Sequence, residues 1–379
     1  MCKGKKPMSK IREEAVAVEA TKYAMCMRQD VPNEQGEHEV QVFTFPDYET
    51  IIRLMHLYKV LAKVMRLKAP LFRWKPGRVP LRLFGTRSCA EGRVVPTQLG
   101  MELLRYANEN MEGNRFQFPK SEFHPLIELF GRHVRRIDSY VGIPTEEACA
   151  KLNECIEAMR AEAGTKAFQN KRDRHLRASR DATQGMRALV DGLFRRRSRI
   201  LVVRLVLSYR MGTTSFAPRS ISDLFNHVSE QQAREHRDEF IRVLKRKYRV
   251  PLPTYAWKEE LGQFTSYHYH LLLFFDGSVA HDGFSVGNEI GNYWIDVITG
   301  RKGRFHNCNA SKHCNQGIGI INYYDTDKIK ALKELVIPYL TKSDYFVRLV
   351  SKGRIFGKGG LPKAEGNKRG RPRKYRFEL

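Results

Sequence analysis

The second half of the chain alternates between short apolar runs and charged, amphipathic stretches. ILVVRLVLSY (200–209) is apolar at successive positions, which predicts a central strand buried on both faces. A charged helix is expected at about 222–248, followed by strands at 253–261 and 267–275 that form a hairpin. A further strand is expected within 314–324, and a helix follows it. This order predicts an α+β fold, in which an antiparallel sheet carries helices on one side.

The first half has a different pattern, with apolar residues three and four positions apart. This spacing predicts helices near 48–67, 97–112, 121–138 and 145–163, the last with Thr145 as its N-cap. We therefore expect three parts along the chain. They are a mainly helical N-terminal region (1–194), an α+β domain (195–357) and a basic, flexible tail (358–379).

The charge of the chain indicates its class of partner. Sixty-seven Lys and Arg residues against 41 Asp and Glu residues give a formal net charge of +26. A surplus of this size favours a polyanionic partner, and nucleic acid before a membrane. No apolar stretch is long enough for a membrane span, and no apolar segment follows the basic N-terminus as it would in a signal peptide.

The cysteines do not form a disulfide framework, because there are seven and they are scattered. This usage fits a reducing cytoplasm, which is the location we expect. His306, Cys308, His313 and Cys314 lie close together in sequence, but their spacing matches no familiar zinc motif, so a structural zinc site is not favoured.

The main candidate for chemistry lies in the predicted hairpin, in TSYHYHLLLFFDG (265–277). His268 and His270 share one face of the strand, since side chains alternate with period two. Glu260, in the preceding strand, can lie beside both histidines, whereas Glu259 points to the other face. Two imidazoles and one carboxylate are suitable ligands for a divalent metal, although a His-x-His pair alone is more often incidental.

A second candidate is IPYLTK (337–342). Tyr339 and Lys342 are three residues apart and share one face of a helix. A tyrosine is a weak nucleophile unless a cation or metal lies nearby, and Lys342 could supply that charge. Pro338 either kinks this helix or begins a new one, and in both cases it restricts the backbone before Tyr339.

Together these motifs resemble the HUH endonucleases that initiate rolling-circle replication. More narrowly, four segments resemble the filamentous-phage and prophage replication proteins grouped with the YagK/YfjJ C-terminal domain, over roughly residues 195–357. The segments are WKEELGQFTSYHYHLLLFFDG (257–277), IGNYW (290–294), GIGIINYYD (317–325) and YLTKSDYF (339–346). The N-terminal half resembles no family that we can name.

The resemblance implies a role for each motif residue. His268, His270 and Glu260 would bind Mg²⁺ or Mn²⁺, Tyr339 would attack a DNA phosphorus and hold the 5′ end, and Lys342 would assist. The protein would nick and rejoin single-stranded DNA at an origin, together with a host helicase and polymerase. A transposase or relaxase with the same chemistry, or a non-catalytic DNA-binding regulator, are the alternatives. Ser343 stands four residues after Tyr339, so the resemblance implies one active tyrosine rather than two.

The tail contains KRGRPRK (368–374), which resembles an AT-hook. Such segments lie in the narrow minor groove of A·T-rich DNA, where arginine is drawn to the negative potential. The residues that would contact double-stranded DNA are Arg369, Gly370, Arg371, Pro372 and Arg373.

Overall fold

The computed structural model describes residues 26–32, 38–44, 48–83, 86–107, 118, 120–209, 228–247, 254–262, 266–310, 317–342 and 345–362. The chain forms two compact units. Unit 1 contains the described parts of Met1–Tyr48, Ser179–Asp344 and Leu349–Leu379, and unit 2 contains those of Glu49–Ala178 and Tyr345–Arg348. The helix α7 (Lys166–Arg196) contributes its first part to unit 2 and its second part to unit 1.

Unit 1 is built on a six-stranded sheet with the order β10-β6-β8-β7-β12, in which β9 also pairs with β6. Every pairing in this sheet is antiparallel, as the sequence predicts. The strands are β6 (Arg199–Tyr209), β7 (Thr254–Gly262), β8 (Ser266–Asp276), β9 (Gly303–Asn307), β10 (Gly319–Asn322) and β12 (Phe356–Lys358).

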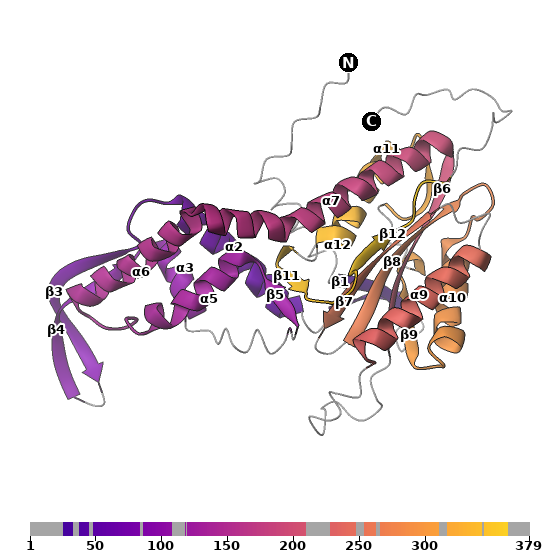
Figure 1. Ribbon diagram of the computed structural model, residues 1–379. Coiled ribbons are helices and arrows are strands. Elements are labelled where there is room, and N and C mark those ends of the chain that lie inside the picture. Colours follow the sequence, from indigo (N-terminus) through magenta and orange to yellow (C-terminus); the bar gives the residue numbers. More distant parts are fainter. Residues whose placement is uncertain are drawn as a thin grey trace, which may run out of the picture. The chain divides into compact units, whose positions relative to one another are not determined.

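Helices cover both faces of this sheet (Figure 1), so the expectation of helices on one side is wrong. The physical reason lies in β6, where Ile200–Leu207 are buried without a break, because a strand apolar on both faces must be covered on both. One face, which we call the α7 face, packs against α7, α11 (Thr326–Ala331), the π-helical turn η3 (Leu332–Val336) and α12 (Ile337–Lys342).

The opposite face, which we call the α9 face, is covered by α9 (Glu230–Lys247), α10 (Gly283–Tyr293) and the π-helical turn η1 (Trp294–Ile298). Helix α9 begins later than the sequence predicts, and the Ser229 hydroxyl accepts a hydrogen bond from the Gln232 amide at its start. Residues 222–227, the first part of the predicted helix, lie outside the described residues. A short 3-10 helix, η2 (Cys308–Ala310), follows β9.

Unit 2 is mainly helical. Its helices are α2 (Tyr48–Arg66), α3 (Gln98–Ala107), α5 (Pro125–Asp138), α6 (Glu146–Gly164) and the first part of α7. The Thr145 side chain caps α6 by accepting a hydrogen bond from the Ala148 amide at 3.1 Å, as the sequence predicts.

Strands that the sequence analysis missed accompany these helices. The pairs are β3 (Phe72–Leu83) with β4 (Thr86–Pro96), β5 (Ser121–Phe123) with β11 (Val347–Leu349), and, in unit 1, β1 (Cys26–Pro32) with β2 (His38–Thr44). Among the described helices, none is both long enough and apolar enough to cross a bilayer.

Candidate functional site

The two histidines lie side by side on β8, and β7 brings a carboxylate next to them. In the β7–β8 register Glu260 lies opposite His268, and Lys258 lies opposite His270. Because side chains alternate, these four residues share the α7 face, whereas Glu259 is buried on the α9 face. The hairpin geometry therefore selects Glu260, and not Glu259, as the carboxylate beside the histidines.

Glu260 contacts both imidazoles. Its Oε2 atom lies 3.4 Å from Nε2 of His268 and 3.1 Å from Nε2 of His270, and the two rings meet edge to face at 5.1 Å between centroids. Both histidines are buried, while the Glu260 side chain keeps 28% of its surface exposed. The Glu260 side chain is therefore partly accessible to solvent, whereas the two imidazoles are covered by protein.

The charge state of the cluster follows from its burial and its contacts. Burial raises the pKa of Glu260, but attraction to His270 and hydrogen bonds from both histidines outweigh this and hold that pKa well below its usual range. Burial lowers the pKa of His270, which Glu260 only partly offsets, and His268 and Arg204 lower it further. The favoured state is a carboxylate beside a neutral imidazole, which are the protonation states that ligate metals.

The donor set fits a divalent cation. One possible ligand atom from each of Glu260, His268 and His270 lies within 4.8 Å of the other two, and no other such group occurs among the described residues. Adjacent ligands on one ion, each bonded at about 2.1 Å, lie roughly 3.0–3.4 Å apart. The two distances from the Glu260 oxygen match this spacing, and a triad of three ligands leaves coordination positions open.

Tyr339 lies against the same cluster. Its hydroxyl is hydrogen-bonded to Nδ1 of His270 at 2.5 Å, and the two rings meet edge to face at 5.0 Å between centroids. The phenol is almost fully buried at 4% exposure. Burial raises its pKa above the ordinary value, and Arg204 opposes this shift, so at neutral pH the phenol keeps its proton.

Three consecutive helical elements place Tyr339 there. Helix α11, the π-helical turn η3 and α12 follow one another without a gap, and Pro338 is the second residue of α12. Proline has no amide hydrogen for the helical bond to the preceding turn, and the wider π-helical turn lies directly before it. Ile337 and Leu340 pack into the core of the α7 face and fix the position of α12.

Arg204 is a cation of this site that the sequence analysis missed. It interrupts the apolar strand β6, it is 7% exposed, and its guanidinium lies 3.9 Å from the centroid of the Tyr339 ring. Arg204, Val202 and Val206 share the α7 face by the alternation of the strand. A charged residue inside an apolar run was the signal that could have found it, because burying an arginine is costly without a specific contact.

The other tyrosines near this part of the sequence have different surroundings. Tyr324 is exposed, and Tyr323 packs at the edge of the α7-face core. Tyr345 belongs to unit 2, where its hydroxyl bonds to that of Tyr58 and its ring stacks on His124. Tyr339, by contrast, is hydrogen-bonded to His270, a histidine of the triad.

Several residues predicted from the sequence lie outside the described part of the chain. The side chain of Lys342 is among them, as are the AT-hook-like segment 368–374 and both His313 and Cys314. The DNA-contacting assignments of Arg369, Gly370, Arg371, Pro372 and Arg373 therefore stay predictions.

Comparison with known proteins identifies the family of the chain. The YagK/YfjJ C-terminal domain family matches residues 160–356, which is more than half of the chain. The matched range contains the whole triad, Tyr339 and Arg204. No curated protein and no solved structure matches the chain significantly. The chain therefore belongs to the YagK/YfjJ C-terminal domain family.

Proposed function

We propose that this protein is an HUH-type replication initiator, which nicks and rejoins single-stranded DNA through a covalent bond to Tyr339. The observation that carries the proposal is the contact between the Tyr339 hydroxyl and His270, a member of the one candidate metal-binding triad among the described residues. The net charge of +26 supports a polyanionic substrate.

Glu260, His268 and His270 would hold the cation, which we propose to be Mg²⁺ or Mn²⁺. When bound, such an ion polarises a phosphate oxygen and stabilises the charge that develops on it. The mixed set of two imidazoles and one carboxylate suits Mn²⁺ well, since it combines nitrogen and oxygen ligands.

The chain's own groups would carry the nucleophile. Tyr339 Oη forms a bond to phosphorus, the bond from phosphorus to the 3′ oxygen breaks, and the 5′ end stays on the tyrosine. With the cation on Nε2, the neutral His270 ring would carry its proton on Nδ1 and donate a hydrogen bond to the Tyr339 oxygen at 2.5 Å, which favours the phenolate. The phenol proton passes to solvent water, and the departing 3′ oxygen takes up a proton from solvent to become a hydroxyl. Rejoining is the reverse reaction with a 3′ hydroxyl as the attacking group.

Arg204 and Lys342 would stabilise the negative charge that this reaction places on the Tyr339 oxygen and on the phosphate. The buried guanidinium of Arg204 over the ring of Tyr339 opposes the rise that burial imposes on the pKa of the phenol. Lys342 follows Tyr339 by three residues on α12 and is the second cation in the proposal.

The test is incubation of the protein with DNA of its own genetic element and Mn²⁺ or Mg²⁺. A nicked product with protein on its 5′ end supports the proposal. A protein that binds this DNA and never cleaves it would instead be a regulator. Priming of synthesis from the released 3′ hydroxyl distinguishes an initiator from a transposase or relaxase, which transfers the strand to another DNA.

A further inference from the structure

A second concave surface lies on the α9 face, on the other side of the sheet from the triad. It is a cleft of about 790 Å³ between α9 on one side and β7, β12 and the segment before β12 on the other. All of its lining residues belong to unit 1. Since Trp257 and Glu260 point to opposite faces of β7, the sheet itself separates this cleft from the candidate metal site.

The cleft is strongly basic. Seven of its lining residues are cationic, and Asp238 is the single acid among them. Lys245, Arg246 and Arg354 are exposed, and within the described residues no carboxylate pairs with any of the three. The other four cations are Arg234, Arg237, Arg242 and Lys358.

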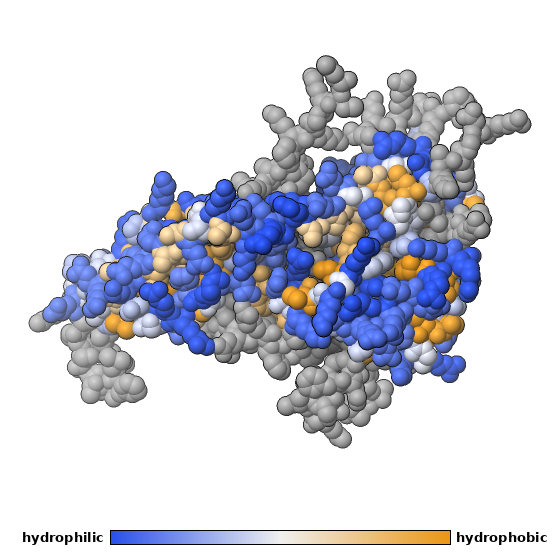
Figure 2. Space-filling view, in the orientation of Figure 1, coloured by the Kyte–Doolittle hydropathy of each residue, from blue (hydrophilic) through white to orange (hydrophobic). Residues whose placement is uncertain are grey.

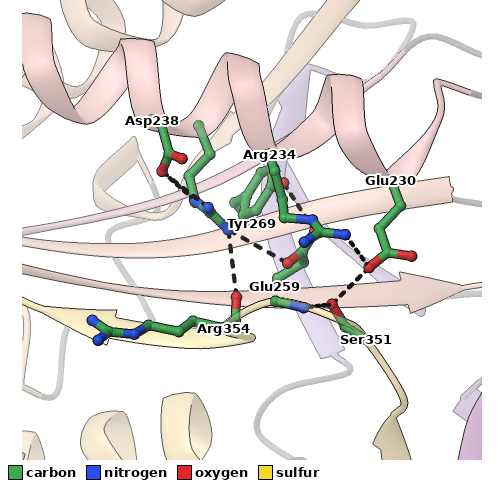
Figure 3. Close-up of polar contacts among 9 residues, drawn as sticks. Glu230, Arg234, Asp238, Glu259, Tyr269, Ser351 and Arg354 are labelled. Atoms are coloured by element: carbon green, nitrogen blue, oxygen red, sulfur yellow. Dashed lines mark hydrogen bonds and ion pairs between the residues drawn. The ribbon is translucent and has the colours of Figure 1, made fainter.

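The cations follow the groove in a row. Helix α9 contributes Arg234, Arg242 and Arg246, which are separated by eight and four residues and therefore lie along one side of the helix. The row spans about 18 Å at the helical rise of 1.5 Å per residue. Arg354 lies on the opposite wall, and its side chain runs beneath Asp238 (Figure 3). The outer side of α9 is hydrophilic in the space-filling view (Figure 2).

A partly buried network joins the two walls (Figure 3). Arg237 bonds to the Arg354 carbonyl and lies 3.5 Å from the Glu259 carboxylate, which also accepts a bond from the Tyr269 hydroxyl at 3.1 Å. Glu230 accepts bonds from Arg234 at 2.5 Å and from the Ser351 hydroxyl at 2.7 Å. These contacts hold the groove open in one geometry, so a ligand would not have to assemble it.

Two aromatic rings form the floor. Trp257 is covered by the Arg237 guanidinium at 4.2 Å, and Gly357 lies so close that a Cβ there would approach its ring to 2.6 Å. Tyr255 remains partly exposed, with the Lys245 ammonium 5.2 Å from its ring centroid. Tyr255 is therefore the ring available for stacking, while Trp257 is structural.

We propose that this cleft binds single-stranded nucleic acid, with its cations along the phosphates and a base stacked on Tyr255. A row of cations beside an exposed aromatic ring is the chemistry that recognises a single strand without sequence preference. A duplex is a convex cylinder that would meet only the rims, and a flat bilayer cannot enter the cleft. The inference goes beyond the proposed function, because a strand held on the α9 face is not the strand at Tyr339.

The test is fluorescence anisotropy with labelled single strands of about 20 nucleotides. It is run in EDTA, so that no cleavage occurs and binding is measured apart from the proposed chemistry. The variant Arg246→Glu/Arg354→Glu replaces one cation on each wall by an anion. It should bind about tenfold more weakly, with a salt slope smaller by about 1.4, the value for two lost phosphate contacts on a single strand. Oligo-dT and oligo-rU strands distinguish DNA from RNA as the natural ligand.

Two further variants keep the inference falsifiable. Tyr255→Leu keeps apolar packing and removes the ring, and should cost about fivefold or more in affinity. Lys59→Glu/Lys63→Glu reverses the same amount of charge on the exposed side of α2 in unit 2, and should leave affinity within about twofold.

If the groove variant and the α2 variant lost equal affinity for single strands, the loss would be explained by net charge alone, and the inference would be overturned. If the groove variant lost as much affinity for duplex DNA, or for anionic vesicles, as for single strands, the choice of a single strand as the ligand would be overturned. Normal nicking together with groove-independent binding would refute this inference alone. Groove-dependent binding without any nicking would refute the proposed function alone.

Discussion

Replacing Arg204 by methionine tests whether its cation activates Tyr339. Methionine keeps an unbranched apolar stem on β6 and removes the guanidinium that lies 3.9 Å from the ring centroid of Tyr339. The pKa of the phenol is already raised by burial, and Arg204 is the largest influence that opposes this rise. Without Arg204 the pKa should rise further, so the phenol becomes harder to deprotonate.

The magnitude follows from the burial of the pair. A desolvated cation–π contact is worth about 2 kcal/mol. If that energy favours the transition state, its loss slows adduct formation about thirtyfold, since about 1.4 kcal/mol is tenfold in rate. Folding stability should change less, because removing a buried charge also removes its desolvation cost.

The assay is single-turnover formation of the covalent adduct with saturating DNA and Mn²⁺, beside a urea denaturation curve for each variant. Arg204→Lys keeps the charge without the planar group and should fall between the wild type and Arg204→Met. Arg199→Met removes an exposed arginine from the same strand and serves as the control. Equal adduct rates for Arg204→Met and the wild type, with intact folding, would refute the role of Arg204.

Three further predictions concern the metal, the tail and unit 2. His270→Ala should abolish nicking and should abolish Mn²⁺ binding measured by titration calorimetry, yet it should preserve most of the DNA affinity. The control His281→Ala changes an exposed histidine and should keep nicking, Mn²⁺ binding and DNA affinity, whereas unchanged Mn²⁺ binding in His270→Ala would contradict the triad. Removing the residues after 362 should weaken duplex binding and its salt dependence but spare cleavage of a short single strand, and lost cleavage would mean that the tail belongs to the active site. Burial, His175 and Arg172 hold the pKa of His124 well below 6.5, so as the pH falls below about 6.5 the unfolded chain takes up a proton that folded His124 does not. In urea denaturation, His124→Asn should therefore reduce the pH dependence of stability in this range by about 1.4 kcal/mol per pH unit, while His236, His270 and His306 keep their contributions; an unchanged dependence would contradict the prediction.

The chemistry of the hairpin could be predicted because it depends on short-range periodicity. His268 and His270 share a face by alternation alone, and the short turn brings Glu260 opposite His268. The antiparallel sheet follows from the same hairpin and from the apolar strand β6. The N-cap at Thr145 could be predicted for the same reason, because it bonds to an amide only three residues away.

Arg204 and the covering of both faces could not be predicted, because each depends on contacts between distant segments. Arg204 reaches Tyr339 across 135 positions of sequence, and a lone charge in an apolar strand does not reveal its partner. The run 200–207 indicated burial on both faces, but assigning helices to each face required knowing which apolar stripes pack together. The β3–β4 hairpin was missed because alternating Arg and apolar residues around Gly85 were not interpreted as strands.

The most direct test of the account is the identity of the residue that carries the DNA. After nicking in the presence of Mn²⁺, the protein is digested and the DNA-linked peptide is mapped by mass spectrometry. The account predicts a single phosphotyrosine at Tyr339, and no adduct in Tyr339→Phe, which loses only a hydroxyl and about 1 kcal/mol of stability. A phosphotyrosine at Tyr323, Tyr324 or Tyr345, or an adduct that persists in the Tyr339→Phe variant, would contradict it.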